Sequence, residues 1–95
     1  MEIGKKREGN EVTFELVGWL DTQAAPELGE AVKELQDGDS LVMDLARLEY
    51  VASSGLRQFV AAYKKVEGKM VLRNVSDDIK GILKATGLDK RIPVA

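Results

Sequence analysis

The stretch LVMDLARLEYVASSGL, residues 41–56, decides the fold. It opens with a short continuous apolar run from Leu41 to Met43, a pattern typical of a central β-strand that is covered on both faces. Near its end stands Ser53, whose hydroxyl can cap the free N–H groups at the start of a helix. One apolar stripe then follows the helical period: Leu56, Phe59, Val60 and Tyr63. The stretch therefore predicts a strand followed by a helix.

Toward the N-terminus the sequence predicts a β-hairpin and then a first helix. Residues 1–18 form two candidate strands around a turn at residues 8–10, because apolar and polar side chains alternate in the second strand until Gly18 ends the run. Asp21 can cap the next helix, and Pro26 suits its first turn. The buried stripe of this helix, which stops at residues 37–38, consists of Leu28, Val32 and Leu35.

Toward the C-terminus the sequence predicts another strand, a third helix and a short last strand. Residues 69–73 form the strand. Ser76 caps the helix, whose acidic first turn suits the positive end of the helix dipole, and Gly87 ends it. Residues 90–94 predict a last strand at a sheet edge, because Pro93 cannot donate a ladder hydrogen bond.

These elements predict that residues 1–95 form one α/β domain. Its sheet is mixed and mostly parallel, with an N-terminal hairpin and three to four helices. In such sheets, binding sites gather at the carboxyl ends of the strands. Residues 19–22 and residues 51–55 both meet that description, so we expect the two segments to form the site.

Composition excludes several classes of function. The 14 basic and 16 acidic residues give a net charge of -2, so no overall field draws the chain to nucleic acid or to anionic lipid. Histidine and cysteine are absent, which removes the commonest groups for acid–base catalysis, thiol catalysis and metal binding. No apolar stretch approaches the roughly 20 residues of a membrane helix. We therefore expect a cytoplasmic binding protein without metal, cofactor or membrane insertion, and not an enzyme.

Ser54 is the candidate for control by modification. It stands at a predicted helix start, where free N–H groups and the helix dipole favour a phosphate. A phosphoserine adds about -1.5 to -2 charges, enough to repel an acidic or closely packed partner, and Arg57 on the same helical face could pair with it. Taken alone, Ser53, Ser54 and Gly55 are typical of a plain helix start with a glycine for close packing, which is what most such triplets are. A nucleophilic serine would need a base for which the spacing gives no candidate.

Residues 41–56 also resemble the signature of STAS domains, and specifically of bacterial anti-sigma-factor antagonists. In that family a hydrophobic strand ends in Asp-Leu, a short apolar loop follows, and Asp-Ser-Ser-Gly-Leu begins the next helix. The segment Gly18-Trp19-Leu20-Asp21 is similar to the family's Gly-x-Leu-Asp, whose aspartate lies beside the phosphorylation loop. The order of elements agrees too, so the resemblance covers nearly the whole chain.

The resemblance implies a phosphorylation-controlled binding switch. Its partner would be an anti-sigma factor with an ATP-binding serine kinase fold, which the unphosphorylated protein sequesters so that a sigma factor is released. By resemblance this kinase modifies Ser54, and a serine phosphatase is the second implied partner. The implied partner-binding residues are Trp19, Asp21, Ser53, Ser54, Gly55, Leu56 and Arg57.

Two residues depart from the family pattern. Ala52 stands where aspartate is common, and Arg57 stands where a small residue is common. The missing acid favours an alternative function, in which the domain is a constitutive STAS subunit of a transporter or stress-signalling complex without a phospho-switch. The arginine alters how a partner packs on the helix or sets which partner is chosen.

Three further residues are open to interpretation. Asp21 contacts a partner, caps the first helix, or does both. Trp19 should point opposite to Leu20 if the strand persists, and it is either an exposed interface anchor or an ordinary packed aromatic. Asp44, at a strand end, is predicted to fix a loop, because no second carboxylate is spaced to act with it in catalysis.

Overall fold

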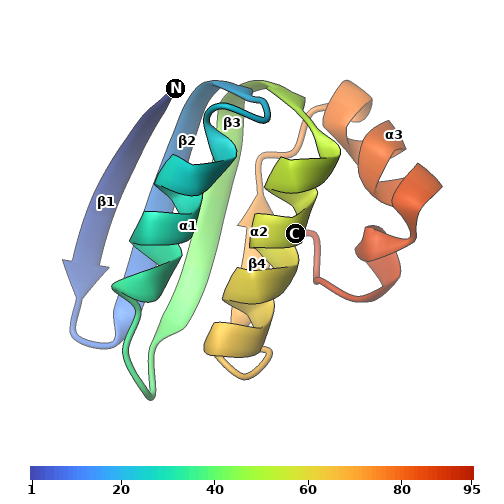
Figure 1. Cartoon of the computed structure of the whole chain (residues 1–95). Helices are drawn as coiled ribbons and strands as arrows, with labels where there is room; N and C mark the ends of the chain where they lie inside the picture. The colour runs from blue at the N-terminus through green and yellow to red at the C-terminus, as the bar shows by residue number, and fades with distance from the viewer.

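Helices lie against one face of a four-stranded sheet in the computed structural model, which describes all 95 residues (Figure 1). The elements in chain order are β1 (Glu2–Glu8), β2 (Glu11–Leu20), α1 (Ala25–Lys33), β3 (Ser40–Val51), α2 (Ser53–Lys65), β4 (Met70–Arg73), α3 (Asp77–Thr86) and a short 3-10 helix (Leu88–Lys90). The strands are ordered β1-β2-β3-β4, with β1 antiparallel to β2 and the other two pairs parallel. This confirms the predicted α/β fold with its N-terminal hairpin. None of the helices is both long and apolar enough to cross a membrane.

The buried side chains of the strands all project from a single face. The strand register places Phe14 beside Met43 and Met43 beside Leu72, and all three are buried. Val42, which points the opposite way, is half-exposed. The prediction that residues 41–43 are covered on both faces is therefore wrong, although β3 is an inner strand as expected.

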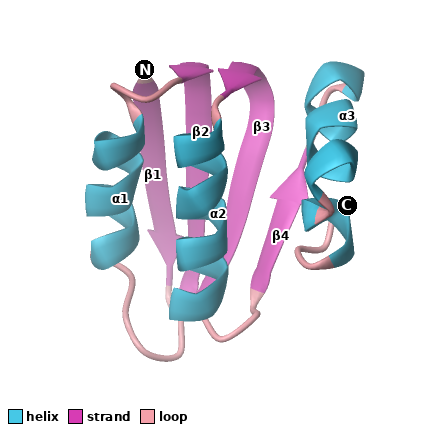
Figure 2. Cartoon of the chain, turned by 45° about the vertical axis from the view of Figure 1, so that its right-hand side comes forward, coloured by secondary structure: helices cyan, strands magenta, loops and turns pink.

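The direction of the crossovers explains why only one face is covered. From β2 to β3 and from β3 to β4 the chain moves across the sheet in the same sense, through α1 and then α2. Right-handed crossovers that advance in one direction place their helices on the same face. Figure 2 shows α1 and α2 side by side in front of the sheet, with α3 beyond β4.

Two predictions about strands are wrong, the end of the second strand and the existence of the last one. The strand β2 does not stop at Gly18 but continues to Leu20, because a register shift against β3 at this point accommodates the glycine. Gly18 adopts φ +99° there, a backbone conformation that residues with a side chain rarely adopt. Residues 90–94 do not form a strand. The chain turns through the 3-10 helix, and only Val94 bridges to Leu72 on β4.

The residues predicted to begin and end a helix are confirmed at both ends of α3. Ser76 is the N-cap, and its hydroxyl accepts a hydrogen bond of 3.3 Å from the backbone N–H of Ile79. Gly87 is the C-cap, as predicted. In α1, Pro26 lies in the first turn, but the helix ends at Lys33, two residues before the last member of the predicted stripe.

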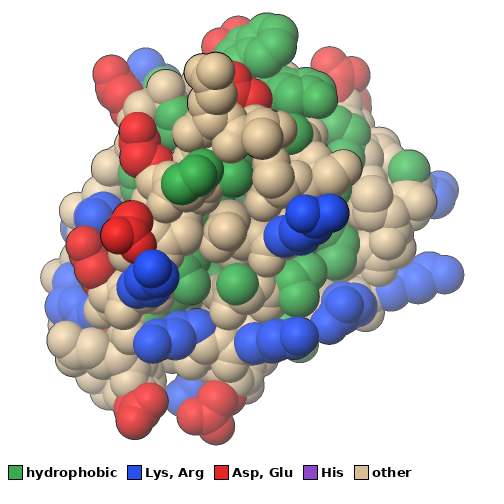
Figure 3. Space-filling view, viewed as in Figure 1, with side chains coloured by type: hydrophobic (Ala, Val, Ile, Leu, Met, Phe, Trp, Pro, Cys, Tyr) green, Lys and Arg blue, Asp and Glu red, His purple; other side chains and the backbone are tan.

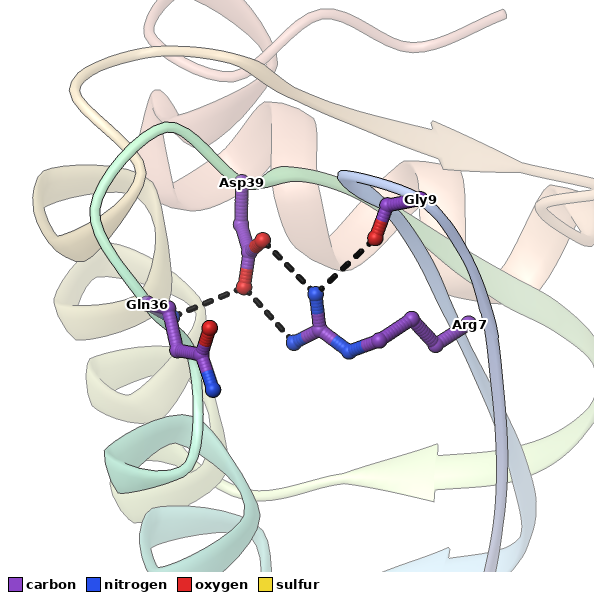
Figure 4. A network of polar contacts seen from close by, with 4 residues as sticks. All are labelled: Arg7, Gly9, Gln36 and Asp39. Atoms are coloured by element: carbon purple, nitrogen blue, oxygen red, sulfur yellow. Dashed lines mark hydrogen bonds and ion pairs between the residues drawn. The ribbon is translucent and has the colours of Figure 1, made fainter.

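The only buried charged residue, Asp39, is 1% exposed and ties the hairpin to the connection between α1 and β3. Arg7 of β1 donates two hydrogen bonds of 2.8 Å, one to each carboxylate oxygen, and the backbone N–H of Gln36 donates a third of 2.7 Å (Figure 4). Arg7 also donates to the carbonyl of Gly9 at 3.2 Å. The hydrogen bonds from Arg7 and then from Gln36 lower the pKa of Asp39 from 3.8 to about 2.

We predict that this network makes stability depend on acid pH. Because the pKa of Asp39 is lower in the folded state than in the unfolded state, its contribution is complete above about pH 4 and is lost as the pH falls toward 2. Asp39→Asn should lower the melting temperature by several degrees at pH 7, and the difference from the parent should shrink to a small part of that value near pH 2. Thermal unfolding followed by circular dichroism tests this, with exposed Asp37→Asn as the control. A difference that is constant from pH 7 to pH 2 would contradict the assignment.

Candidate functional site

The carboxyl ends of β2 and β3 meet at one edge of the sheet, at the top of Figure 1. Leu20 is paired with Val51, and the backbone N–H of Ala52 donates a hydrogen bond of 2.8 Å to the carbonyl of Leu20. Residues 19–22 and residues 51–55 are therefore brought side by side, as the sequence predicted.

The helix α2 begins at this edge without a side-chain cap. Its N-cap residue is Ala52, which has extended backbone (φ -87°, ψ 168°) and no side-chain acceptor. The prediction that Ser53 is the cap is wrong, because Ser53 is already the first helical residue and a capping side chain must come from the extended residue before it. The first turn also contains no acidic residue. Its free N–H groups therefore have neither an acceptor side chain nor a carboxylate nearby in sequence.

Ser54 connects this helix start to the loop after β2. Its side chain is half-buried, and its hydroxyl donates a long hydrogen bond of 3.5 Å to the hydroxyl of Thr22. Thr22 belongs to the segment 19–22 that was expected at the site, but it was not predicted individually as a site residue. Its place opposite Ser54 follows from the parallel pairing of the two strands, because each residue lies a few positions beyond a strand end. Neither hydroxyl is a base, so this hydrogen bond does not activate Ser54 as a nucleophile.

Gly55 lets α2 approach the sheet closely. A Cβ atom on Gly55 would lie 2.6 Å from Cγ of Leu20, which is too close unless Leu20 moves, and 3.0 Å from Cγ2 of Val51, which is a tight contact. The next residue, Leu56, is only 7% exposed and packs in the core. Gly55 and Leu56 therefore contribute to the packing that positions Ser54, and their predicted contact with a partner stays a prediction.

A groove of about 750 Å³ runs between α1 and α2 and reaches Ser54. Arg57 and Gln58 line it from α2, and Glu30 and Lys33 line it from α1. Arg57 thus lies on the same face of the helix as Ser54, as the spacing predicted. Glu30 and Lys33 form an ion pair of 2.9 Å with each other, whereas Arg57 is exposed and has no acidic partner.

An exposed aromatic pair lies at the same edge of the sheet as Ser54, on the face that the helices leave uncovered. Trp19 is 57% exposed and Tyr50 is 41% exposed, while the next residue on Trp19's strand, Leu20, is fully buried. The two rings lie 5.3 Å apart between centroids at an angle of 41°. Figure 3 shows hydrophobic side chains protruding above the ends of β2 and β3. The expected orientation of Trp19 is confirmed, and Tyr50 was missed because its opposition to Trp19 arises only from the strand register.

Two aspartates hold loops, and of the two only Asp21 is next to the site, because Asp44 lies seven residues before the end of β3. Asp21 accepts hydrogen bonds from the backbone N–H groups of Gln23 at 3.1 Å and Ala24 at 2.9 Å. It therefore closes the turn before α1, whose own N-cap is Ala24. Asp44 does not lie at a strand end as predicted, because β3 continues to Val51. It accepts from the N–H of Ala46 in the same strand at 3.0 Å and from the side-chain amide of Asn74 at 3.1 Å, so the loop that it holds is the one after β4. No group of three or more acidic side chains is placed to hold a metal ion.

Three comparisons place these features among known proteins. The family model of the STAS domain matches residues 3–95. The chain is 30% identical over 95 residues to the anti-sigma-B factor antagonist of Listeria monocytogenes, which covers 95% of this chain and 83% of that protein. It is 28% identical over 99 residues to the anti-sigma-B factor antagonist of Bacillus subtilis, covering 100% and 91% respectively. The solved structure of the anti-sigma factor antagonist SpoIIAA in its unphosphorylated form has a similar fold, with a TM-score of 0.80 and 18% identity over 99% of this chain and 88% of that one.

The close approach at Gly55 predicts a large effect of one methyl group. Gly55→Ala should lower the free energy of unfolding by about 1–3 kcal/mol, because the new Cβ displaces the fully buried Leu20. Gly81→Ala is the matched control. It is a glycine inside α3 with open space around a Cβ, so the change should raise the free energy of unfolding by about 0.5–1 kcal/mol. Urea unfolding measures both, and equal effects of the same sign would contradict this packing.

The uncapped start of α2 predicts a stabilising substitution. Ala52→Asp supplies an acceptor in the extended backbone that an N-cap needs, and should raise the free energy of unfolding by about 1 kcal/mol. Ala52→Asn provides the same acceptor without the charge and separates the hydrogen bond from the interaction with the helix dipole. If neither variant is more stable than the parent in urea, the assignment of Ala52 as the N-cap is wrong.

Proposed function

The chain belongs to the STAS domain family of anti-sigma-factor antagonists, and we propose that it is a binding protein, not an enzyme, whose affinity for an anti-sigma factor is switched at Ser54. In the unphosphorylated form it sequesters the anti-sigma factor in the bacterial cytoplasm and so releases a sigma factor. The partner, a serine kinase with an ATP-binding fold, phosphorylates Ser54 and ends the binding. A serine phosphatase restores it.

The position of Ser54 carries this proposal. Its hydroxyl lies at the edge where two chain segments meet, in the first turn of a helix that has no side-chain cap and no acidic residue in that turn. A phosphate there meets free N–H groups and the positive end of the helix dipole, so the helix persists while the surface gains about two negative charges. A change of charge without a change of fold is what a reversible binding switch requires.

The surface around Ser54 supplies the contacts that we propose for the partner. Trp19, Ser53 and Arg57 are exposed, and Asp21 is half-buried. Together with Tyr50, Trp19 forms an exposed aromatic pair, the kind of rigid apolar feature that anchors protein interfaces. A phosphate on Ser54 would weaken the binding of a partner that contacts both this aromatic pair and the α1–α2 groove.

One observation favours a second candidate function. Ala52 provides no acid at the start of α2, where the family pattern has aspartate. If that acid is needed for recognition by a kinase, Ser54 stays unmodified and the domain is a constitutive subunit of a larger assembly.

We predict that Ser54→Asp weakens binding to the co-purifying anti-sigma factor by about tenfold or more, because a negative charge is placed in a closely packed contact. Ser53→Asp tests how strongly the effect depends on position: it adds the same charge to a neighbouring exposed residue of the proposed contact surface, and should weaken binding less than Ser54→Asp. Isothermal titration calorimetry with the purified pair measures both. Unchanged affinity in Ser54→Asp would refute the switch.

Mass spectrometry of the protein isolated from its own cells decides between the two candidates. Phosphate on Ser54 in a fraction of the molecules is the expected result. Ser54 that is unmodified under every growth condition, with a permanent partner bound, would support the constitutive subunit.

A further inference from the structure

Arg57 is a cation without a partner beside the proposed modification site. We propose that Arg57 binds the phosphate on Ser54 inside the α1–α2 groove and thereby acts as an internal clamp that stabilises the phosphorylated form. This inference rests on the proposed modification of Ser54, and it specifies how this chain itself accommodates the added charge.

The geometry of α2 brings the two side chains together. Ser54 and Arg57 are three residues apart in one helix, a spacing that separates their Cβ atoms by about 5–6 Å, and both line the groove. A guanidinium on its long side chain reaches a phosphate at that separation and can donate two parallel hydrogen bonds to it. No backbone movement is needed for the contact.

The charges around the groove leave Arg57 free for this role. Glu30 and Lys33, on the facing wall, are paired with each other at 2.9 Å. Asp21 in the adjacent loop accepts hydrogen bonds from two backbone N–H groups at Oδ1 and forms no ion pair with Arg57. No residue of α2 is acidic, so nothing on the same helix competes with a phosphate for the guanidinium.

The other cations of α2 are too distant to substitute for Arg57. Lys64 and Lys65 lie ten and eleven residues after Ser54, or about 15 Å along the helix axis. Basic side chains are prominent across the lower part of the helical face in Figure 3. A phosphate on Ser54 at the upper end of α2 is therefore within reach of one cation of this helix, and Lys64 offers a control of equal charge.

Phosphorus NMR on protein with phosphoserine placed at position 54 during synthesis tests the clamp directly. Arg57 favours the doubly charged phosphate and so lowers the pH at which the phosphorus signal titrates. In Arg57→Gln this midpoint should rise by about 0.5 pH unit or more, whereas Lys64→Gln should titrate like the parent. Phosphorylation should also raise the melting temperature of the parent by more than that of Arg57→Gln.

The two measurements need no partner, so their outcome is separate from that of the proposed function. Identical titration midpoints in the parent and in Arg57→Gln would overturn the clamp. That outcome would leave untouched the proposal that phosphorylation of Ser54 ends binding to the anti-sigma factor. Conversely, a Ser54→Asp variant that binds its partner normally would refute the switch, without changing the interaction between the phosphate and Arg57.

Discussion

The parallel hydrogen-bonded ladder between β2 and β3 is the constraint on which the rest of the structure depends. Parallel strands need a crossover, which α1 provides, and their carboxyl ends then emerge at the same edge of the sheet. Leu20 and Val51 close the ladder. The hydroxyls of Thr22 and Ser54, each a few residues further on, meet at 3.5 Å although 32 residues separate them in the chain.

Features with a local physical cause could be predicted from the sequence. Ser76 and Gly87 mark the ends of α3 because a cap depends only on the adjacent turn. The two segments of the site could be predicted as well, because the order of strands and helices alone determines which strand ends share an edge. The face on which Arg57 joins Ser54 follows from the helical period.

Features that depend on distant contacts could not be predicted. Asp39 follows two residues typical of a turn, and only its pairing with Arg7, 32 residues away, makes it a buried carboxylate. The strand β3 continues to Val51 although Leu45, Leu48 and Val51 are buried at intervals of three, because register shifts against β2 break the alternation. The bare face of the sheet depends on the direction of two crossovers, which an amphipathic stripe does not encode.

The uncapped start of α2 makes its first turn easy to unwind. No side-chain hydrogen bond at Ala52 has to break, so local opening of this turn costs little free energy compared with global unfolding. Opening stops at Gly55 and Leu56, because Gly55 is wedged against Leu20 and Leu56 is buried. Ser53 and Ser54 can therefore leave the helical conformation while Gly55 and Leu56 stay packed in place. For the proposed phosphorylation, this means that the Ser54 hydroxyl can become accessible through opening of one helical turn while the core of the protein stays folded.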